Sequence, residues 1–223
     1  MTARPKAILL DALGTLIGLE PPTPRLQAGL HARGYDVSAE QAKRAIRAEI
    51  RYYRAHLDEG RDTESLQDLR ERCAAAMEPE LPGVPRAVIL EALLAALRFF
   101  AYPDAVPALT ALRASGIRLV VVSNWDFSLH ERLSETGLTP LLDGAIASAE
   151  VGAAKPDPAI FARALELAGT TSAWHVGDTP EVDLDGAQAT GLPGILLDRT
   201  GAAPGALKTL LELIPLISGE RGG

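Results

Sequence analysis

The chain has 223 residues and a formal net charge of −7, and 47% of its residues are apolar. The apolar content excludes intrinsic disorder, and the length suits one large domain, or a domain with a smaller insert, that buries a real core. The acidic balance argues against nucleic acid or an anionic membrane as the main partner, because both favour a basic protein face. Cys73 is the only cysteine, which excludes a disulfide framework and a thiolate metal cluster.

The N-terminal segment does not resemble a targeting signal. Residues 1–6 are followed by only four apolar residues and then by Asp11, whereas a signal peptide needs a longer apolar stretch and a cleavage site. No segment approaches the roughly 20 apolar residues that span a bilayer. A single cysteine fits a reducing compartment, so we expect a cytoplasmic protein.

Short apolar runs separated by helical patterns predict a parallel sheet. The runs cover residues 7–10, 117–122, 145–147, 173–176 and 194–197. Runs of this length that are apolar on both faces fit strands buried between helices, and segments 103–115 and 157–168 have helical length. The alternation predicts a doubly wound, Rossmann-like α/β fold, in which ligands bind at the carboxyl ends of the strands.

Residues 19–98 interrupt this alternation with a pattern that is helical throughout. Segments 66–77 and 88–97 are predicted helices, and a third contains an apolar stripe at helical spacing, formed by Ile46, Ile50, Tyr53 and Leu57. We therefore expect a helical cap domain, residues 19–98, inserted into an α/β core of residues 1–18 and 99–223. The tail, residues 218–223, is expected to fray.

Candidate site residues follow each of the first two long runs. Asp11 comes directly after the first run and is followed by a glycine turn, so its carboxylate can act as a nucleophile or metal ligand. The alternative is a turn aspartate that satisfies backbone amides. Ser123 and Asn124 follow the second run, where a hydroxyl and free amides suit a phosphoryl oxygen. The alternative for Ser123 is a helix cap, and both roles are compatible.

Three more candidates carry charge. Lys155 precedes a helix that Asp157 and Pro158 open as N-cap and first residue, and its alternative is a solvated loop lysine. Asp178 and Asp183, after the fourth run, can face one crevice with Asp11 and offer the oxygen ligands that Mg²⁺ prefers. Their alternative is to complement the dipole of the following helix.

In chain order these residues form four motifs that resemble those of the haloacid dehalogenase-like (HAD) superfamily. The motifs are Asp11-x-x-Gly14-Thr15, Ser123-Asn124, Lys155-Pro156 and Gly177-Asp178…Asp183-x-x-Gly186-Ala187. The resemblance spans residues 7–197, and the helical insert lies where this superfamily places its C1 cap. The first two motifs are most similar to those of bacterial relatives in the DREG-2-like subfamily.

The resemblance implies a Mg²⁺-dependent hydrolase. Asp11 would attack a phosphoryl group and form an aspartyl-phosphate that water hydrolyses. Asp11, Asp178 and the backbone carbonyl of Leu13 would hold Mg²⁺, with Asp183 bound to it directly or just behind these ligands. Phosphoryl transfer depends mostly on positioning and charge stabilisation, which agrees with this set.

The resemblance also implies the substrate-binding residues. Ser123, Asn124 and Lys155 would bind the substrate, with Ser123 and Lys155 neutralising the phosphoryl oxygens, and Thr15 would complete the catalytic set. The implied substrate is a small phosphorylated metabolite or, in the alternative below, a haloacid, with no nucleic acid or membrane partner. A monomer and a homodimer both remain open.

Position 13 departs from the phosphatase pattern. HAD phosphatases carry a second Asp two residues after the nucleophile as general acid and base, and this chain has Leu13 there. General acid–base help is worth roughly 10²–10⁴ in rate. Four outcomes stay open: a weakly basic leaving group, an acid from another residue, dehalogenation, in which halide leaves unprotonated, or binding without turnover.

Dehalogenation receives partial support, because haloacid dehalogenases also lack the second Asp. They need no metal, however, and typically lose the first acid of the fourth motif, which this chain keeps as Asp178. Arg25 is the nearest positional counterpart of the arginine that grips halide and carboxylate. We therefore place a phosphatase ahead of a dehalogenase.

A row of arginines lies beside the apolar stripe of the insert. Its members, Arg44, Arg47, Arg51 and Arg54, share one helix face. They form either an anion-attracting wall or, as charge runs usually do, a solvated face. His175 is expected to be a strand residue packed in the core, and Trp125 either touches substrate or packs.

Overall fold

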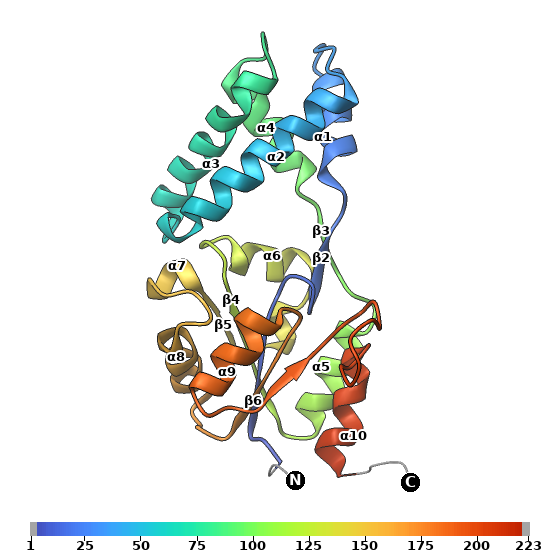
Figure 1. Cartoon of the computed structure of the whole chain (residues 1–223), viewed down its shortest axis with the longest axis vertical. Helices are drawn as coiled ribbons and strands as arrows, with labels where there is room; N and C mark the ends of the chain where they lie inside the picture. The colour runs from blue at the N-terminus through green and yellow to red at the C-terminus, as the bar shows by residue number, and fades with distance from the viewer. Residues whose placement is uncertain (1–3, 220–223) are drawn as a thin grey trace. The chain divides into compact units, whose positions relative to one another are not determined.

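The computed structural model describes residues 4–219, which divide into two compact units (Figure 1). One, called the α/β unit, joins the segment that ends at Gly18 to the segment that begins at Ala101. The other, called the helical unit, is Leu19–Phe100. Two short strands, β2 (Ile17–Leu19) and β3 (Phe99–Ala101), pair with each other where the chain passes between the units.

The α/β unit contains a five-stranded parallel sheet, which confirms the predicted fold class. Its strand order is β5-β4-β1-β6-β7. The strands are β1 (Ala7–Leu10), β4 (Arg118–Ser123), β5 (Gly144–Ala147), β6 (Ala173–Gly177) and β7 (Gly194–Leu196). All four residues of β1 are buried, as expected for a central strand covered on both faces.

Helices cover both faces of this sheet. In Figure 1, α8 and α9 lie on one side and α5 and α10 on the other. The helices are α5 (Ala105–Ala114), α6 (Leu129–Glu135), α7 (Ser148–Val151), α8 (Pro158–Ala168), α9 (Asp185–Ala189) and α10 (Leu213–Ser218). Short helical turns span Thr139–Leu141, Pro180–Leu184 and Leu210–Glu212. Leu9 and Val122 of the sheet share one buried cluster with Phe161 of α8.

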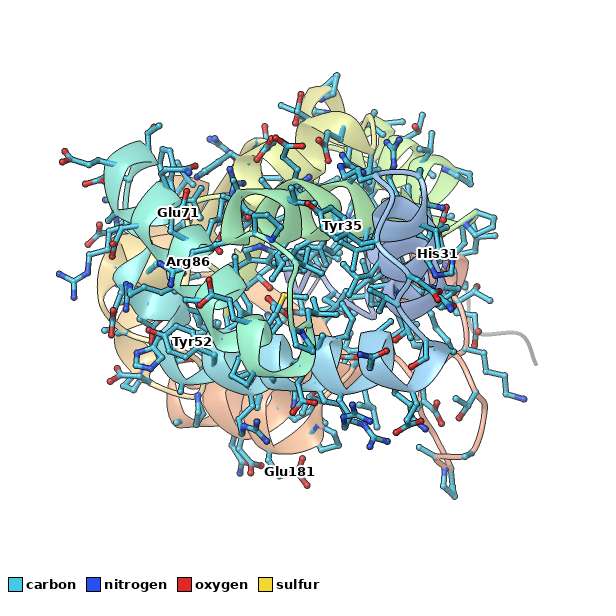
Figure 2. All side chains as sticks on the ribbon, turned by 90° about the horizontal axis from the view of Figure 1, so that it is seen from above. His31, Tyr35, Tyr52, Glu71, Arg86 and Glu181 are labelled. Carbon is cyan, nitrogen blue, oxygen red and sulfur yellow. The ribbon has the colours of Figure 1, made fainter. Side chains whose placement is uncertain are left out.

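The helical unit has four helices and its own core. They are α1 (Pro22–His31), α2 (Ala39–His56), α3 (Thr63–Met77) and α4 (Arg86–Ala96), with short turns at Leu57–Glu59 and Glu78–Glu80. Capping boxes at Ser38 and Asp62 open α2 and α3. Tyr35 and Tyr52, labelled in Figure 2, pack against this core, which includes Leu30, Met77 and Ile89.

The apolar stripe predicted within α2 is only partly buried. Ile46 is 4% exposed and belongs to the core of the helical unit, whereas Ile50 is 38% exposed. Leu57 lies outside the helix, because α2 ends at His56. Helical spacing alone therefore overstated the width of the buried face.

The expectations for the two chain ends concern residues that the structure describes only in part. Ser218 is the last residue of α10 and Gly219 follows it, while residues 220–223 of the expected frayed tail lie outside the described residues. Residues 1–3 of the N-terminal segment also lie outside them. Within residues 4–219, no helix is both long enough and apolar enough to cross a membrane.

Candidate active site

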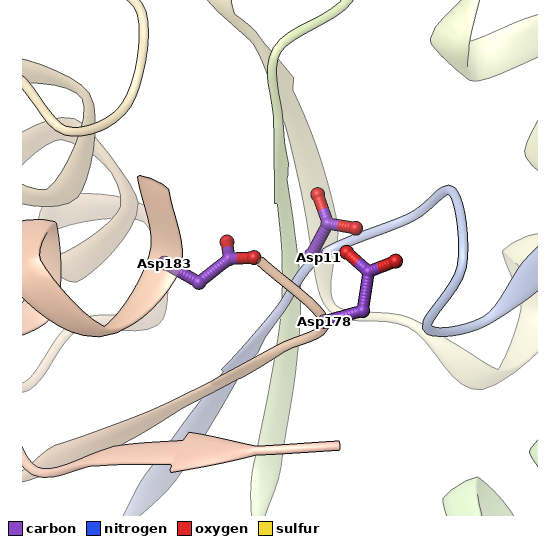
Figure 3. A group of neighbouring side chains, drawn as sticks. All are labelled: Asp11, Asp178 and Asp183. Carbon is purple, nitrogen blue, oxygen red and sulfur yellow. The ribbon is translucent and has the colours of Figure 1, made fainter. Parts of the chain in front are cut away.

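Three aspartates lie together at the carboxyl edge of the sheet. Asp11 follows β1, Asp178 follows β6, and Asp183 lies in the turn after β6. One carboxylate oxygen from each lies within 4.8 Å of the others, as the close-up in Figure 3 illustrates. The strand order reverses between β1 and β6, and ligands of doubly wound sheets bind at such a switch point.

Lys155 connects two of these carboxylates. Its side chain is 1% exposed, and its Nζ donates to Asp11 Oδ1 at 2.7 Å and to Asp183 Oδ1 at 2.6 Å. Ser123, the last residue of β4, donates its hydroxyl to the same Asp11 oxygen at 3.1 Å. Asp11 Oδ1 thus accepts two hydrogen bonds, and Oδ2 accepts none from the residues that the structure describes.

The backbone around Lys155 is held by Asn124. The side-chain oxygen of Asn124 accepts from the Lys155 amide at 2.7 Å, and its nitrogen donates to the Lys155 carbonyl at 2.9 Å. The Asn124 side chain therefore orients Lys155 in this structure. The expected contact between Asn124 and substrate stays a prediction.

Asp183 is fully engaged by its neighbours. Besides Lys155, His175 Nε2 lies 2.9 Å from Asp183 Oδ1, and the Thr179 amide donates to Oδ2 at 3.0 Å. His175 is buried in β6, as predicted, but its contact with Asp183 was not anticipated. No sequence signal marks this contact, because a strand histidine at an apolar position is equally consistent with simple packing.

The charges at the site shift several pKa values. Burial opposes the charged form of Lys155, but Asp11 and Asp183 outweigh it and raise the pKa of Lys155. Burial also favours the neutral form of Asp183, yet the contacts with His175 and Lys155 hold its pKa well below the usual value. Burial lowers the pKa of His175. At neutral pH the site therefore contains a charged lysine, an ionised Asp183 and a neutral His175.

Asp178 has a different environment from the other two aspartates. Asp178 is exposed to solvent, but desolvation by the surrounding protein atoms, followed by the nearby Asp11 carboxylate, raises the pKa of Asp178. Thr179 donates a hydrogen bond to it at 3.1 Å, but it forms no ion pair within the described part of the chain. Of the oxygens of the neighbouring Asp11 and Asp178 carboxylates, Lys155 binds only Asp11 Oδ1. These two carboxylates therefore suit a hard divalent cation.

The loop after Asp11 supplies a further oxygen. The Ala12 carbonyl accepts from the Leu16 amide at 2.8 Å and the Ile17 amide at 2.9 Å, which closes a tight turn. The Leu13 carbonyl accepts no hydrogen bond from residues 4–219. It is thus available as a ligand, so this oxygen and the carboxylates of Asp11 and Asp178 fit a divalent metal. Because both Asp183 oxygens are engaged, Asp183 fits better as a support behind these ligands.

Two glycines permit this arrangement. Gly14 has a φ of +86°, and a Cβ at this position would overlap the Asp178 carboxylate. A Cβ at Gly177 would overlap the Asp183 side chain. Gly14 is therefore explained by its left-handed backbone and by the close approach of Asp178. Gly177 is explained by the close approach of Asp183.

Thr15 lies in the same turn, but its hydroxyl makes no hydrogen bond to Asp11. Its side chain is fully buried, and its hydroxyl has no hydrogen-bond partner among the described residues. Trp125 is 7% exposed and donates its ring N–H to Ser128 at 3.2 Å, so packing accounts for it. Arg25, in the helical unit, forms an ion pair with Glu20 at 2.7 Å.

The arginine row on α2 is only partly neutralised. Arg44 forms an ion pair with Glu80 at 2.6 Å. Arg47, Arg51 and Arg54 are exposed and, with Ile50, line a surface hollow. Both interpretations of the row, an anion-attracting wall and a solvated face, stay open.

The fold and the site together define a doubly wound α/β protein that has a cluster of aspartates at its switch point, with a buried lysine paired to one of them. The family model for haloacid dehalogenase-like hydrolases matches residues 5–191. The chain belongs to this family of hydrolases.

Individual relatives agree with this assignment. Haloacid dehalogenase-like hydrolase domain-containing protein 3 of Mus musculus is 41% identical over 91 residues, which are 40% of this chain and 36% of the relative. Glyceraldehyde 3-phosphate phosphatase of Methanopyrus kandleri is 28% identical over 177 residues, 78% of this chain and 72% of the relative. The matches span 36% to 56% of the first three curated relatives.

Solved structures share the fold over nearly the whole chain. A HAD phosphatase from Thermococcus onnurineus is 25% identical with a TM-score of 0.65, and the match covers 97% of this chain and all of that one. The L-2-haloacid dehalogenase of Xanthobacter autotrophicus is 20% identical with a TM-score of 0.68, covering 99% and 100%. At 20% sequence identity, the similarity to the dehalogenase shows a shared fold and nothing more.

Proposed function

We propose that this protein is a Mg²⁺-dependent phosphatase of a small phosphorylated metabolite whose leaving group needs no protonation. One observation carries the proposal: Asp11 accepts hydrogen bonds from Lys155 and Ser123, and a carboxylate oxygen of the unneutralised Asp178 lies within 4.8 Å of it. Relatives named as phosphatases, including a phosphoserine phosphatase of Thermus thermophilus that is 35% identical over 105 residues, support a small phosphorylated metabolite as substrate. The restriction on the leaving group rests on Leu13 alone.

Asp11 is the proposed nucleophile. Because Lys155 and Ser123 both bind Oδ1, the other oxygen, Oδ2, attacks phosphorus. The bond from phosphorus to the leaving oxygen breaks, and its electron pair departs with that oxygen. Water then hydrolyses the aspartyl-phosphate to inorganic phosphate and restores the carboxylate. Lys155 and Ser123 stabilise the negative charge of the transferred group.

A divalent ion held by Asp11, Asp178 and the Leu13 carbonyl would supply further charge neutralisation at the phosphoryl oxygens. Asp183 acts behind these ligands, where it holds Lys155 through the 2.6 Å ion pair. Thr15 supports the turn that carries them.

Leu13 defines the substrate range in this proposal. Leu13 is 45% exposed and has no acidic proton, so it cannot protonate a leaving alkoxide. Aryl and acyl phosphates depart as weakly basic anions and avoid this requirement. We therefore propose substrates of that kind.

The helical segment 19–98 acts as a C1-type cap that selects substrate, the 1–18 and 99–223 segments form the catalytic core, and the chain belongs with the DREG-2-like subfamily. The protein works in the cytoplasm on a small molecule, as a monomer or homodimer.

A 2-haloacid dehalogenase is the second candidate. Leu13 favours it, because halide leaves without a proton, whereas the retention of Asp178 favours the phosphatase. The two differ in their metal requirement, which makes the test direct.

The test is turnover of p-nitrophenyl phosphate with Mg²⁺ and with EDTA, beside Asp11→Asn. We expect Mg²⁺-dependent turnover that EDTA and Asp11→Asn both abolish while circular dichroism shows an intact fold. Halide release from 2-haloacids in the presence of EDTA would support the dehalogenase instead. Saturable phosphate binding without turnover of any substrate would indicate a non-catalytic binder.

A further inference from the structure

Arg199 binds the loop that follows Asp11. It lies after β7, and its Nε donates to the Gly14 carbonyl at 3.1 Å while its Nη2 donates to the Thr15 carbonyl at 2.6 Å. Its Nη1 donates to both carboxylate oxygens of Asp104 at 3.0 and 3.1 Å. All three guanidinium nitrogens are therefore engaged, and the side chain is only 20% exposed.

Tyr102 and Asp104, which precede α5, hold the Arg199 guanidinium, and these three residues are called the clamp. The guanidinium carbon of Arg199 lies 3.8 Å from the centre of the Tyr102 ring, a cation–π distance. The Tyr102 amide donates to the Leu16 carbonyl at 3.0 Å. Asp104 Oδ2 also accepts from the Leu210 amide at 2.7 Å, which fixes the carboxylate that holds Arg199.

The clamp accounts for three consecutive carbonyls of the loop. Those of Gly14 and Thr15 bind Arg199, and that of Leu16 binds the Tyr102 amide. The preceding carbonyl, of Leu13, is the one that accepts no hydrogen bond within residues 4–219. The loop is thus fixed on one side of the oxygen that is available to a metal.

The segment that carries Arg199 is itself rigidly built. Asp198 Oδ1 accepts from the amide and hydroxyl of Thr200 at 2.9 and 2.6 Å, and its Oδ2 accepts from the Ala203 amide at 2.6 Å. The Asp198 amide donates to the Leu207 carbonyl at 2.7 Å. Arg199 therefore projects from a fixed turn rather than from a free loop.

We propose that Arg199 is a positioning residue that sets the geometry of the metal-binding loop from Asp11 to Leu16. The inference rests on the proposed function, because it concerns the placement of Asp11 and of the Leu13 carbonyl as ligands. An arginine is required, since a planar fork of donors binds two carbonyls and a carboxylate at once. A lysine at this position retains the charge but loses the fork.

The experiment measures metal affinity without substrate. Mn²⁺ is titrated into the whole 223-residue chain and followed by water-proton relaxation, for wild type, Arg199→Met and Arg199→Lys. Arg163→Met is the matched control, because Arg163 is 61% exposed and its ion pair is with Glu166 of the same helix. Melting temperatures, and kcat and KM for p-nitrophenyl phosphate, are measured on the same preparations.

We expect Arg199→Met to weaken Mn²⁺ binding roughly 10–100-fold, the usual effect of removing a residue that orients metal ligands. Arg199→Lys should recover part of the affinity, kcat should fall more than KM rises, and Arg163→Met should match wild type. Wild-type Mn²⁺ affinity in a folded Arg199→Met protein would overturn the inference and leave the proposed function intact. Loss of folding in both Arg199 variants would assign Arg199 to stability alone and also overturn it.

A wild-type protein that binds no Mn²⁺ would instead refute the metal site of the proposed function, and the inference with it. Wild-type Mn²⁺ binding without turnover would count against the phosphatase, while the affinities of the Arg199 variants still decide the inference. The two failures are therefore distinguishable.

Discussion

His175 Nε2 lies 2.9 Å from Asp183 Oδ1, and both side chains are buried. The imidazole ring also packs edge-on against Phe161, at 5.0 Å between ring centres. Asp183 in turn forms an ion pair with Lys155. The Asp183 carboxylate thus links a core histidine to the lysine that binds the proposed nucleophile.

Removal of this hydrogen bond should destabilise the α/β unit. We expect His175→Leu to lower the free energy of unfolding by about 1–3 kcal/mol, because a buried carboxylate oxygen loses a donor. His175→Gln, which retains an N–H donor, should recover part of the loss. Urea denaturation checks both, and equal losses in the two variants would assign the effect to packing against Phe161.

The same histidine should make stability depend on pH. Burial lowers the pKa of His175 below the ordinary value of 6.5, so the unfolded chain binds more protons just below that pH. Its contribution is complete above pH 6.5 and is lost as the pH falls toward the folded-state pKa. The stability of wild type should therefore decrease more than that of His175→Gln between neutral and mildly acidic pH, and parallel curves would contradict the prediction.

Asp198 should contribute to stability in a lower pH range. Hydrogen bonds from Thr200, and then from the Ala203 amide, lower the pKa of Asp198 to about 2, against an ordinary value of 3.8. Its stabilising contribution is present above pH 3.8 and is lost as the pH falls through about 2. A carboxyl-carbon NMR titration should show this low midpoint, and a midpoint near 3.8 would indicate an open turn around Arg199.

Leu13→Asp should extend activity to alkyl phosphates. A carboxyl group at this position can protonate the leaving alkoxide, which is worth roughly 10² or more in rate. The gain in kcat/KM should be large for alkyl phosphates and small for p-nitrophenyl phosphate, which departs readily. Leu13→Asn is the control, because asparagine has the size of aspartate but no titratable proton. No gain on alkyl phosphates would indicate another acid or another chemistry.

Gly14→Ala should strain the backbone and, in addition, disturb the proposed metal site at Asp178. Gly14 and Gly116 both have positive φ angles, +86° and +77°, but only at Gly14 would a Cβ overlap Asp178. Gly116→Ala, with nothing near its Cβ, should cost about 1–2 kcal/mol from the left-handed conformation alone. Gly14→Ala should show that cost and also lose Mn²⁺ affinity. Equal behaviour of the two variants would show that the close approach to Asp178 is unimportant.

Local sequence patterns predicted much of the α/β unit. Apolar runs gave the positions of the parallel strands within one or two residues, because a strand covered on both faces must be apolar on both. Asp157 caps α8 by accepting from the Ala159 amide at 2.8 Å, and Pro158 is the first residue of that helix, as predicted. The apolar stripe of α2 was the exception, since helical spacing does not determine how wide a buried face is.

The amino-acid sequence by itself determined which polar residues end or directly follow the strands, Asp11, Ser123 and Asp178, and that glycine turns lie beside them at Gly14 and Gly177. These features depend on neighbours along the chain, so local spacing reveals them. Only the tertiary structure decided that His175 binds Asp183 and that Arg199 binds the carbonyls after Asp11. The contacts of Arg199 join residues that are 185 and 184 positions apart in the chain. Such contacts exist only once the parallel sheet has brought its strand ends to one edge.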